Sequence, residues 1–260
     1  MKTLSLAFIF SFCGVALAQT PAANMMPDGS RDMYVGLGVG SAPLCDGSGE
    51  RRTRVMPNIQ VQWSNGIFLR NESLGLHLSD EPGLEYGPVL EYERGCRASE
   101  ARKLEGARDI DSSVAVGGFL NYYPAANIRL GSRLLVGTEN DRRRILLNLE
   151  ARKFMQLGQH HGVALSLGFT WANQAYAQTR VDFEPMKVLI SAPAAEAPDY
   201  STHAGIKDVH AGVNWNWELS PDWLVTSQVS IYRLTGSTIE NPLNGRRSYA
   251  TVYTGLAYRF

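Results

Sequence analysis

The sequence of 260 residues lacks a surplus of charge of either sign, since 25 Lys and Arg residues balance 25 Asp and Glu residues. A nucleic-acid partner held by bulk positive charge is therefore not expected. After residue 18 there is no apolar run of the roughly 18–20 residues that a membrane-spanning helix needs. The mean hydropathy of −0.17 also excludes a bundle of such helices. Aromatic and β-branched residues recur throughout, which excludes a disordered chain and leaves one large β domain or an ordinary soluble domain.

The first eighteen residues have the three parts of a secretory signal peptide. Met1-Lys2 is a basic start, Leu4 to Leu17 is almost wholly apolar, and Ala16-Leu17-Ala18 is a small-x-small cleavage site. We expect cleavage after Ala18 and export of the mature chain; the alternative is a buried first helix. Phe12 before Cys13 does not fit a lipoprotein cleavage box, so no lipid anchor is expected.

Cysteine is scarce, and no C-x-x-C spacing is present, which disfavours zinc and thioredoxin-like chemistry. Cys13 leaves with the signal peptide, so export places only Cys45 and Cys96 in an oxidising compartment. Two such thiols suggest a disulfide, with two unpaired loop cysteines as the alternative. The glycine-rich segment 36–40 lacks the following helix of a phosphate-binding loop, and no cofactor is expected.

Beyond residue 32, apolar residues alternate with small or polar ones at a period of two. Val35, Leu37 and Val39 are separated by glycines, and Leu165 and Leu167 are flanked by small residues. Successive side chains of a strand point to opposite faces, so each such segment has one apolar face. A soluble β-sandwich would also show this alternation.

Three features favour an antiparallel transmembrane β-barrel over the sandwich. The apolar segments are ~9–11 residues long, which is the length of a tilted membrane-spanning strand. The chain ends on an alternating strand whose apolar face carries Leu256, Tyr258 and Phe260, which resembles the signal read by the barrel-assembly machinery of the outer membrane. Aromatic residues stand at the ends of the apolar faces, as in the girdles at membrane interfaces: Trp63, Tyr92, Tyr122, Trp171, Trp217, Trp223 and Tyr258.

The spacing of the segments predicts an all-β chain of about twelve strands. We place them near residues 33–40, 54–63, 67–72, 74–79, 84–93, 110–123, 126–137, 143–155, 160–174, 204–219, 222–234 and 247–260. Twelve strands put the long connections outside and both termini on the periplasmic side. Ten or fourteen strands, or one bent strand over 67–79, are the alternatives. The expected organisation is a signal peptide (1–18), a flexible periplasmic arm (19–32) and an outer-membrane barrel (33–260).

The inward face carries polar side chains of both signs. They include Gln60, Gln62, Glu85, Glu91, Arg129, Arg133, Glu150, Arg152 and His210. Such groups can pair and stiffen a closed interior, or they can line a narrow wet channel for small solutes. The sequence leaves both interpretations open.

Catalysis has weak support. A hydrolase set at the outer rim would draw on Asp199, Ser201, His203 and Asp208, but polar residues are common in any external loop. The adjacent pair His160-His161 would point to opposite faces of a strand, which argues against a metal site. We expect no catalytic residues and no metal ligands.

Two segments, Tyr34–Pro43 and Gln62–Leu69, stand in a characteristic order and spacing near the start of the predicted barrel. They resemble the opening strand and the following block of the MipA/OmpV family. Further blocks that look similar are Tyr86-Gly87-Pro88, Trp171-Ala172 with Tyr176, Gly205–Val209, Leu219–Trp223, Tyr232–Leu234 and Gly255–Phe260. Cys45 and Cys96 depart from the pattern expected of the family.

The resemblance implies an outer-membrane protein that is not an enzyme. The named member of the family is a scaffold that binds a lytic transglycosylase and a murein synthase, so these enzymes are the implied partners. Other members are regarded as porin-like or adhesin-like, and both roles remain alternatives. Outer-membrane lipid and lipopolysaccharide are the expected surroundings of the barrel.

Overall fold

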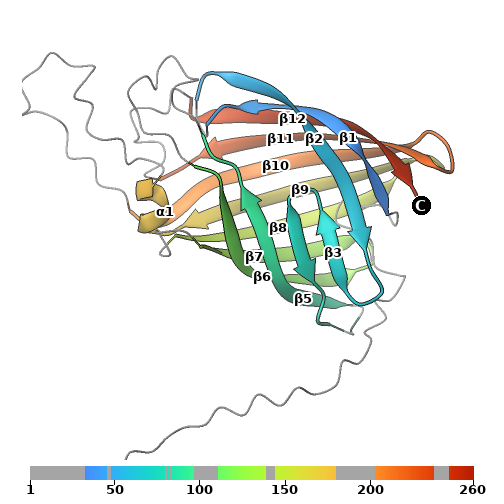
Figure 1. The fold of residues 1–260 in the computed structure, drawn as a ribbon, viewed down its shortest axis with the longest axis horizontal. Coiled ribbons are helices and arrows are strands. Elements are labelled where there is room, and N and C mark those ends of the chain that lie inside the picture. The colour runs from blue at the N-terminus through green and yellow to red at the C-terminus, as the bar shows by residue number, and fades with distance from the viewer. Residues whose placement is uncertain are drawn as a thin grey trace, which may run out of the picture.

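The computed structural model describes residues 33–45, 48–79, 81, 83–96, 111–138, 144–179, 203–236 and 246–260. These residues form a closed antiparallel barrel of twelve strands, in which each strand pairs with its neighbours in sequence and β1 closes against β12 (Figure 1). The predicted signal peptide and arm lie outside the described residues. None of the described residues belongs to a helix long and apolar enough to cross a membrane.

The strands are close to those predicted from the sequence. They are β1 (Tyr34–Pro43), β2 (Arg51–Gln62), β3 (Ile67–Arg70), β4 (Ser73–Leu76), β5 (Leu84–Glu93), β6 (Ser113–Ala125), β7 (Ile128–Gly137), β8 (Ile145–Gln156), β9 (His161–Ala172), β10 (Gly205–Glu218), β11 (Trp223–Leu234) and β12 (Ser248–Arg259). The twelve-strand barrel is thereby confirmed, and residues 67–79 hold two strands where a single bent strand was the alternative. β1 ends and β2 begins three residues further out than predicted, so the first connection is shorter.

A short helix, α1 (Gln174–Thr179), begins where the ninth strand was predicted to continue to residue 174. Asn173 explains the change. Its side-chain Oδ1 accepts a hydrogen bond from the Tyr176 backbone N–H at 3.0 Å, and its carbonyl accepts one from Ala177 at 3.1 Å. An Asn at this position caps a helix N-terminus and ends the strand.

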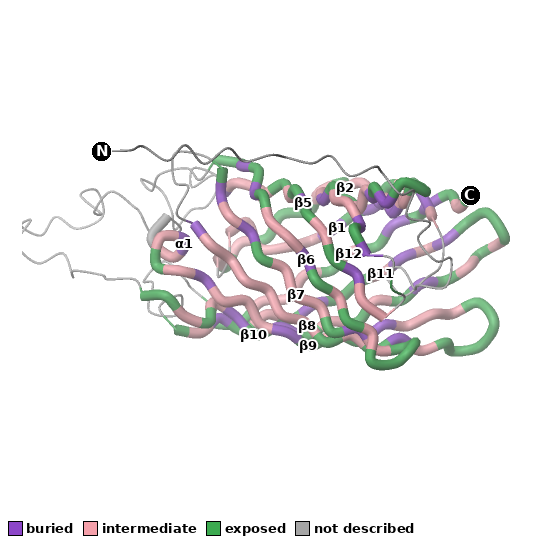
Figure 2. Tube along the Cα trace, turned by 90° about the horizontal axis from the view of Figure 1, so that it is seen from below, coloured by how far each residue is buried: buried purple, intermediate pink, exposed green. Residues whose placement is uncertain are grey.

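Buried, intermediate and exposed residues follow one another along the strands, as the colour changes in Figure 2 show. This is expected where successive side chains point to opposite faces of the wall. Leu37 is 65% exposed and Leu167 is 61% exposed, whereas Asn58 and Gln60 are each 2% exposed. Large apolar side chains are exposed on the outward face around the wall. An outward apolar band with a polar interior is the pattern of a transmembrane barrel, and it is the reverse of a soluble core.

The glycines of β1 make room for an inward tyrosine. Tyr253 of β12 lies over Gly38, where a Cβ atom would come within 2.4 Å of its hydroxyl oxygen. The same hydroxyl donates a hydrogen bond to the Pro57 carbonyl of β2 at 3.4 Å. One side chain therefore crosses the seam at which the first and last strands close the barrel.

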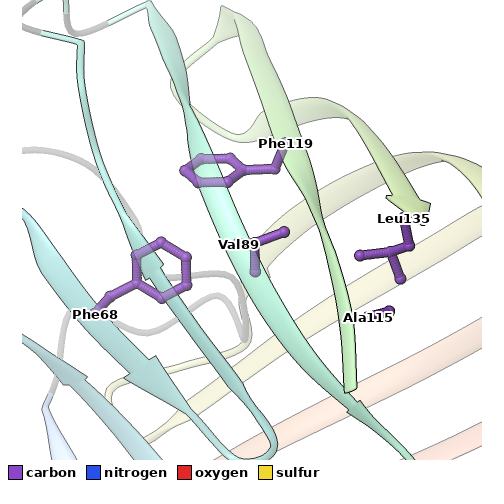
Figure 3. Close-up of a cluster of buried hydrophobic side chains, with 5 residues drawn as sticks. All are labelled: Phe68, Val89, Ala115, Phe119 and Leu135. Carbon is purple, nitrogen blue, oxygen red and sulfur yellow. The ribbon is translucent and has the colours of Figure 1, made fainter. Parts of the chain in front are cut away.

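Part of the interior is apolar. Five buried side chains from β3, β5, β6 and β7 form a cluster, with the Phe68 and Phe119 rings edge to face at 5.4 Å (Figure 3). The other members are Val89, Ala115 and Leu135. The inner surface along these strands is therefore partly apolar, and Phe68, Phe119 and Leu135 also line the interior cavity.

The β3–β4 hairpin is short, so the wall is low beside β2. At its tip, the Asn71 N–H donates to the Ile59 carbonyl and its Oδ1 accepts from the Ile59 N–H, both at 2.9 Å. β2 pairs with β3 only over Gln60–Gln62. Among the described residues, Arg51–Asn58 of β2 is therefore paired on the β1 side alone. We call the space between this edge, the hairpin tip and the end of β5 the notch.

Candidate functional site

The barrel encloses a cavity of about 850 Å³. Its mouth lies at the end of the long connections, where Pro43, Cys45 and Cys96 line it. Its deepest lining side chains include Tyr34 and Gln60, which lie near the end of the barrel at which β1 begins and β2 ends. The cavity thus opens toward the side that is external in a barrel whose short turns are periplasmic.

Positive charge dominates the cavity wall. Among the residues that the structure describes, eight basic side chains line it, against three carboxylates. The basic residues are Arg52, Arg54, Arg70, Arg94, Arg129, Arg133, Arg152 and Lys207, and the acidic ones are Glu72, Glu91 and Glu150. The near-neutral composition of the chain therefore conceals a basic interior.

Each of the three carboxylates is held by arginine. An Arg133 guanidinium nitrogen lies 2.5 Å from Glu91 Oε2, and Arg94 forms an ion pair with Glu72. Glu150 lies between two guanidinium groups, 2.9 Å from Arg152 and 3.3 Å from Arg129. The acidic side chains are thus neutralised, and the surplus charge of the cavity is positive.

A second polar cluster, on β9 and β10, lies outside the cavity lining except for Lys207 and Thr170. Asp208 is 1% exposed, and its Oδ1 lies 3.0 Å from His210 Nδ1 and 3.2 Å from the Thr170 hydroxyl, which donates to it. Lys207 Nζ lies 3.3 Å from the other oxygen. This closed set of contacts stiffens the wall.

Buried side chains occupy the barrel interior at the end where β1 begins and β12 ends. Leu224 is 0% exposed, Phe154 is 2% exposed and Glu85 is 6% exposed, and none of them lines the cavity. Glu85 accepts hydrogen bonds from the Tyr123 hydroxyl at 2.9 Å and from Asn121 at 3.2 Å. The cavity is therefore a cup with a packed floor.

The residues predicted to face the lumen fall into two sets. Six of them line the cavity: Gln60, Glu91, Arg129, Arg133, Glu150 and Arg152. Glu85 and His210 are buried but do not line the cavity. Gln62 is half-buried at the last position of β2 and does not line it either. The sequence reasoning missed Arg52, Arg54 and Lys207. Arg52 and Arg54 share the even parity of Asn58 and Gln60, which is a signal that could have found them.

The predicted interface aromatics lie on the outward face. Six are between 38% and 50% exposed, and Trp171 is half-buried. Trp223 and Tyr258 pack edge to face at 5.6 Å, and Trp217 stacks on Trp215 at 5.9 Å. On the last strand, Leu256 is 46% exposed and Phe260 is 61% exposed.

Cys45 and Cys96 are joined by a disulfide, with their Cα atoms 5.6 Å apart. The bond links the β1–β2 connection to the residue that follows β5 by three positions. It therefore crosses the rim of the cavity above the notch.

The rim set weighed for catalysis is not brought together by the described residues. Asp199 and Ser201 lie outside them, and the Asp208 carboxylate is taken up by His210, Thr170 and Lys207. Within the described ranges, no three His, Cys, Asp or Glu side chains are grouped to hold a metal ion.

A family model described as MltA-interacting protein MipA matches residues 35–260. Among solved structures, the NanC porin is similar with a TM-score of 0.49 and 9% identity, over 87% of this chain and 100% of that chain. The KdgM porin is similar with a TM-score of 0.45 and 8% identity, over 87% and 99% of the two chains. The outer membrane channel DcaP of Acinetobacter baumannii has a TM-score of 0.39 and 8% identity, over 88% and 96%. No curated protein matches the sequence.

Proposed function

Since this chain belongs to the family described as MltA-interacting protein MipA, we propose that it is a non-enzymatic scaffold of the bacterial outer membrane. Its partners are a lytic transglycosylase and a murein synthase. The observation that carries the proposal is the extent of the family match, which begins at the second residue of β1 and ends at Phe260. The likeness thus covers the whole barrel.

The packed floor of the cavity supports a scaffold over an open pore. A scaffold needs a rigid surface on the periplasmic side and has no need of a passage through the wall. The turns at that end are held by side chains. Arg259 Nε donates a hydrogen bond to the Pro221 carbonyl at 2.7 Å, and Arg259 Nη1 forms an ion pair with Glu218 Oε1 at 3.3 Å.

The turns alone offer a limited contact area, since stable interfaces bury ~1,200 Å² or more. We therefore assign part of the partner surface to segment 19–32, which the sequence predicts to be a periplasmic arm. In this proposal, the turns fix the orientation of the partner and the arm adds contact area.

Binding of a purified lytic transglycosylase to the detergent-solubilised barrel tests the proposal. Asp222 is exposed in a turn at the periplasmic end, and Asp111 is exposed at the opposite end. Asp222→Lys and deletion of residues 19–32 should each weaken binding about tenfold, which corresponds to the loss of one or two well-placed contacts. Asp111→Lys, the matched control, should leave binding unchanged. Failure of the wild-type barrel to bind either murein enzyme would overturn the proposal.

A narrow channel is the second candidate, and the volume of the cavity favours it. Conductance across planar bilayers separates the two functions. A scaffold with a packed floor should show no ion current, whereas a channel should show discrete current steps.

A further inference from the structure

The cavity wall combines a surplus of cations with carboxylates that are already paired. Among the described residues, Glu72, Glu91 and Glu150 each lie against at least one arginine and Lys207 is paired with Asp208, whereas Arg54 has no acidic partner. Counted over the described lining residues together with Asp208, the charge of the cup is positive as long as arginine stays protonated.

Arg54 is the clearest sign of a vacant anion position. It lines the cavity near the mouth and is half-buried, yet its guanidinium makes no hydrogen bond or ion pair with any residue that the structure describes. Its position in the sheet explains why. Across the pair with β1 its partner is Gly40, which has no side chain, and on its other side lies the notch.

A second group of arginines lies deeper in the cup. Arg129 and Arg152 lie on either side of the Glu150 carboxylate, and the Glu85 carboxylate also acts on Arg129. Arg129 Nε is buried and has no acceptor within the described part of the chain. Arg54 and this pair both line the same cavity, one toward its mouth and the other toward its floor.

The shape of the cavity strengthens the effect of these charges. A cleft lined by one sign of charge with low-dielectric walls concentrates its field, and an ion pair gains more there than in open water. Because the floor is packed, an anion attracted through the mouth is retained in the cup. Planar guanidinium groups suit carboxylate and phosphate oxygens, which they bind through two parallel hydrogen bonds.

We propose that the cup is a binding site, open to the external side, for a ligand that carries two or more phosphate or carboxylate groups. Arg54 binds one anionic group near the mouth, and the Arg129–Arg152 pair attracts a second one deeper inside. The site lies at the opposite end of the barrel from the surface assigned to murein enzymes, so either proposal can fail without the other.

The test measures binding of inorganic tripolyphosphate to the purified full-length barrel in phosphatidylcholine nanodiscs by titration calorimetry. Wild-type protein should bind it at low ionic strength and lose affinity as salt is raised, and neutral maltotriose should not bind. Arg54→Gln should weaken binding about tenfold, because a charged hydrogen bond of ~1.5–3 kcal/mol is lost. Arg54→Glu should weaken it further. Because Arg54 has no described partner, neither change breaks an ion pair of the fold.

Arg233→Gln is the matched control, since Arg233 is exposed on the outer face of β11 and does not line the cavity. This variant should bind as the wild type does, and circular dichroism should show the same β content for all the proteins. Absence of tripolyphosphate binding, or an equal affinity in the Arg54 variants, overturns the proposal. Equal losses in the Arg233 and Arg54 variants also overturn it, because they would indicate a general charge effect.

A second arm identifies the source of the anionic group. Nanodiscs that also contain a bisphosphorylated lipid A supply phosphate from the membrane. If this lipid lowers the affinity of the wild type for tripolyphosphate, the bound group is a lipid phosphate that reaches the cup. If it has no effect while free tripolyphosphate still binds through Arg54, the ligand is a soluble anion. Both results support the site.

Discussion

Cys45 and Cys96 are bonded to each other across the part of the wall in which β3 and β4 are too short to reach the rim. One lies two residues beyond β1 and the other three residues beyond β5. The bond therefore supplies, at the mouth of the cavity, a link that strand pairing supplies elsewhere around the barrel.

We predict that the double variant Cys45→Ser/Cys96→Ser is less stable by about 2–4 kcal/mol, since closing a loop of this length restrains the unfolded chain. The sequence separation is 51 residues. Urea unfolding in detergent micelles, followed by tryptophan fluorescence, gives the free energy. Treating the wild type with a reductant should produce the same loss and no further loss in the variant. Equal midpoints for wild type and variant would contradict the prediction.

Gly38→Ala should destabilise the barrel by about 1–3 kcal/mol, because the new methyl group would overpack the seam. Its Cβ would lie 2.4 Å from the Tyr253 hydroxyl and 2.7 Å from the Thr254 carbonyl. Gly205→Ala is the control, since no atom lies within 4 Å of the Cβ built there. The same unfolding measurement compares the two variants. A Gly38 variant as stable as the Gly205 variant would show that Tyr253 does not occupy this position.

The Glu91–Arg133 pair should show a favourable coupling of about 1–2 kcal/mol in a double-mutant cycle. Both side chains are less than one-third exposed, and among the described residues the Ser73 hydroxyl also donates a hydrogen bond to Glu91, at 3.4 Å. Arg133→Met alone leaves a partly buried carboxylate without its cation, so it should cost more than the double change Glu91→Gln/Arg133→Met. Additive losses in the two single variants would refute the coupling.

Phe260→Ala should lower the amount of assembled barrel in cells while it changes the stability of the refolded protein little. The side chain is 61% exposed at the end of the chain, so its removal leaves no cavity. Leu167→Ala is a matched control, because Leu167 is equally exposed in the middle of β9. Heat-modifiable gel mobility of outer-membrane fractions measures the folded amount. Equal yields for the two variants would argue against a terminal assembly signal.

The outward and inward faces could be predicted from sequence because a period of two leaves little choice where one face is apolar, as at Leu165 and Leu167. Lys207 could not be placed in this way. The register between β9 and β10 shifts between Ile206 and Asp208, so parity fails at this bulge. Arg54 was missed for another reason. It stood at the first position of the predicted strand, and its even parity with Asn58 and Gln60 was not carried back to that end.

The Cys45–Cys96 bond shows a second limit of prediction from the sequence. The sequence supplies two cysteines and the right compartment, but the distance between them depends on how far the β3–β4 hairpin rises. That height follows from the turn at Asn71, which has a φ of 45°. Asn tolerates this left-handed conformation, and its contacts with Ile59 fix the level of the tip.

The low hairpin makes the barrel unequal around its circumference. Backbone groups on an open strand edge cannot be satisfied by hydrocarbon, and Pro57, which has no N–H, removes only one of the donors along β2. Along the described part of this edge, the unpaired backbone groups favour lipid head groups or water over hydrocarbon beside the notch. A local change in the thickness of the outer leaflet on one side would give each molecule a preferred rotational orientation relative to its neighbours. A barrel of uniform height would have no such preference.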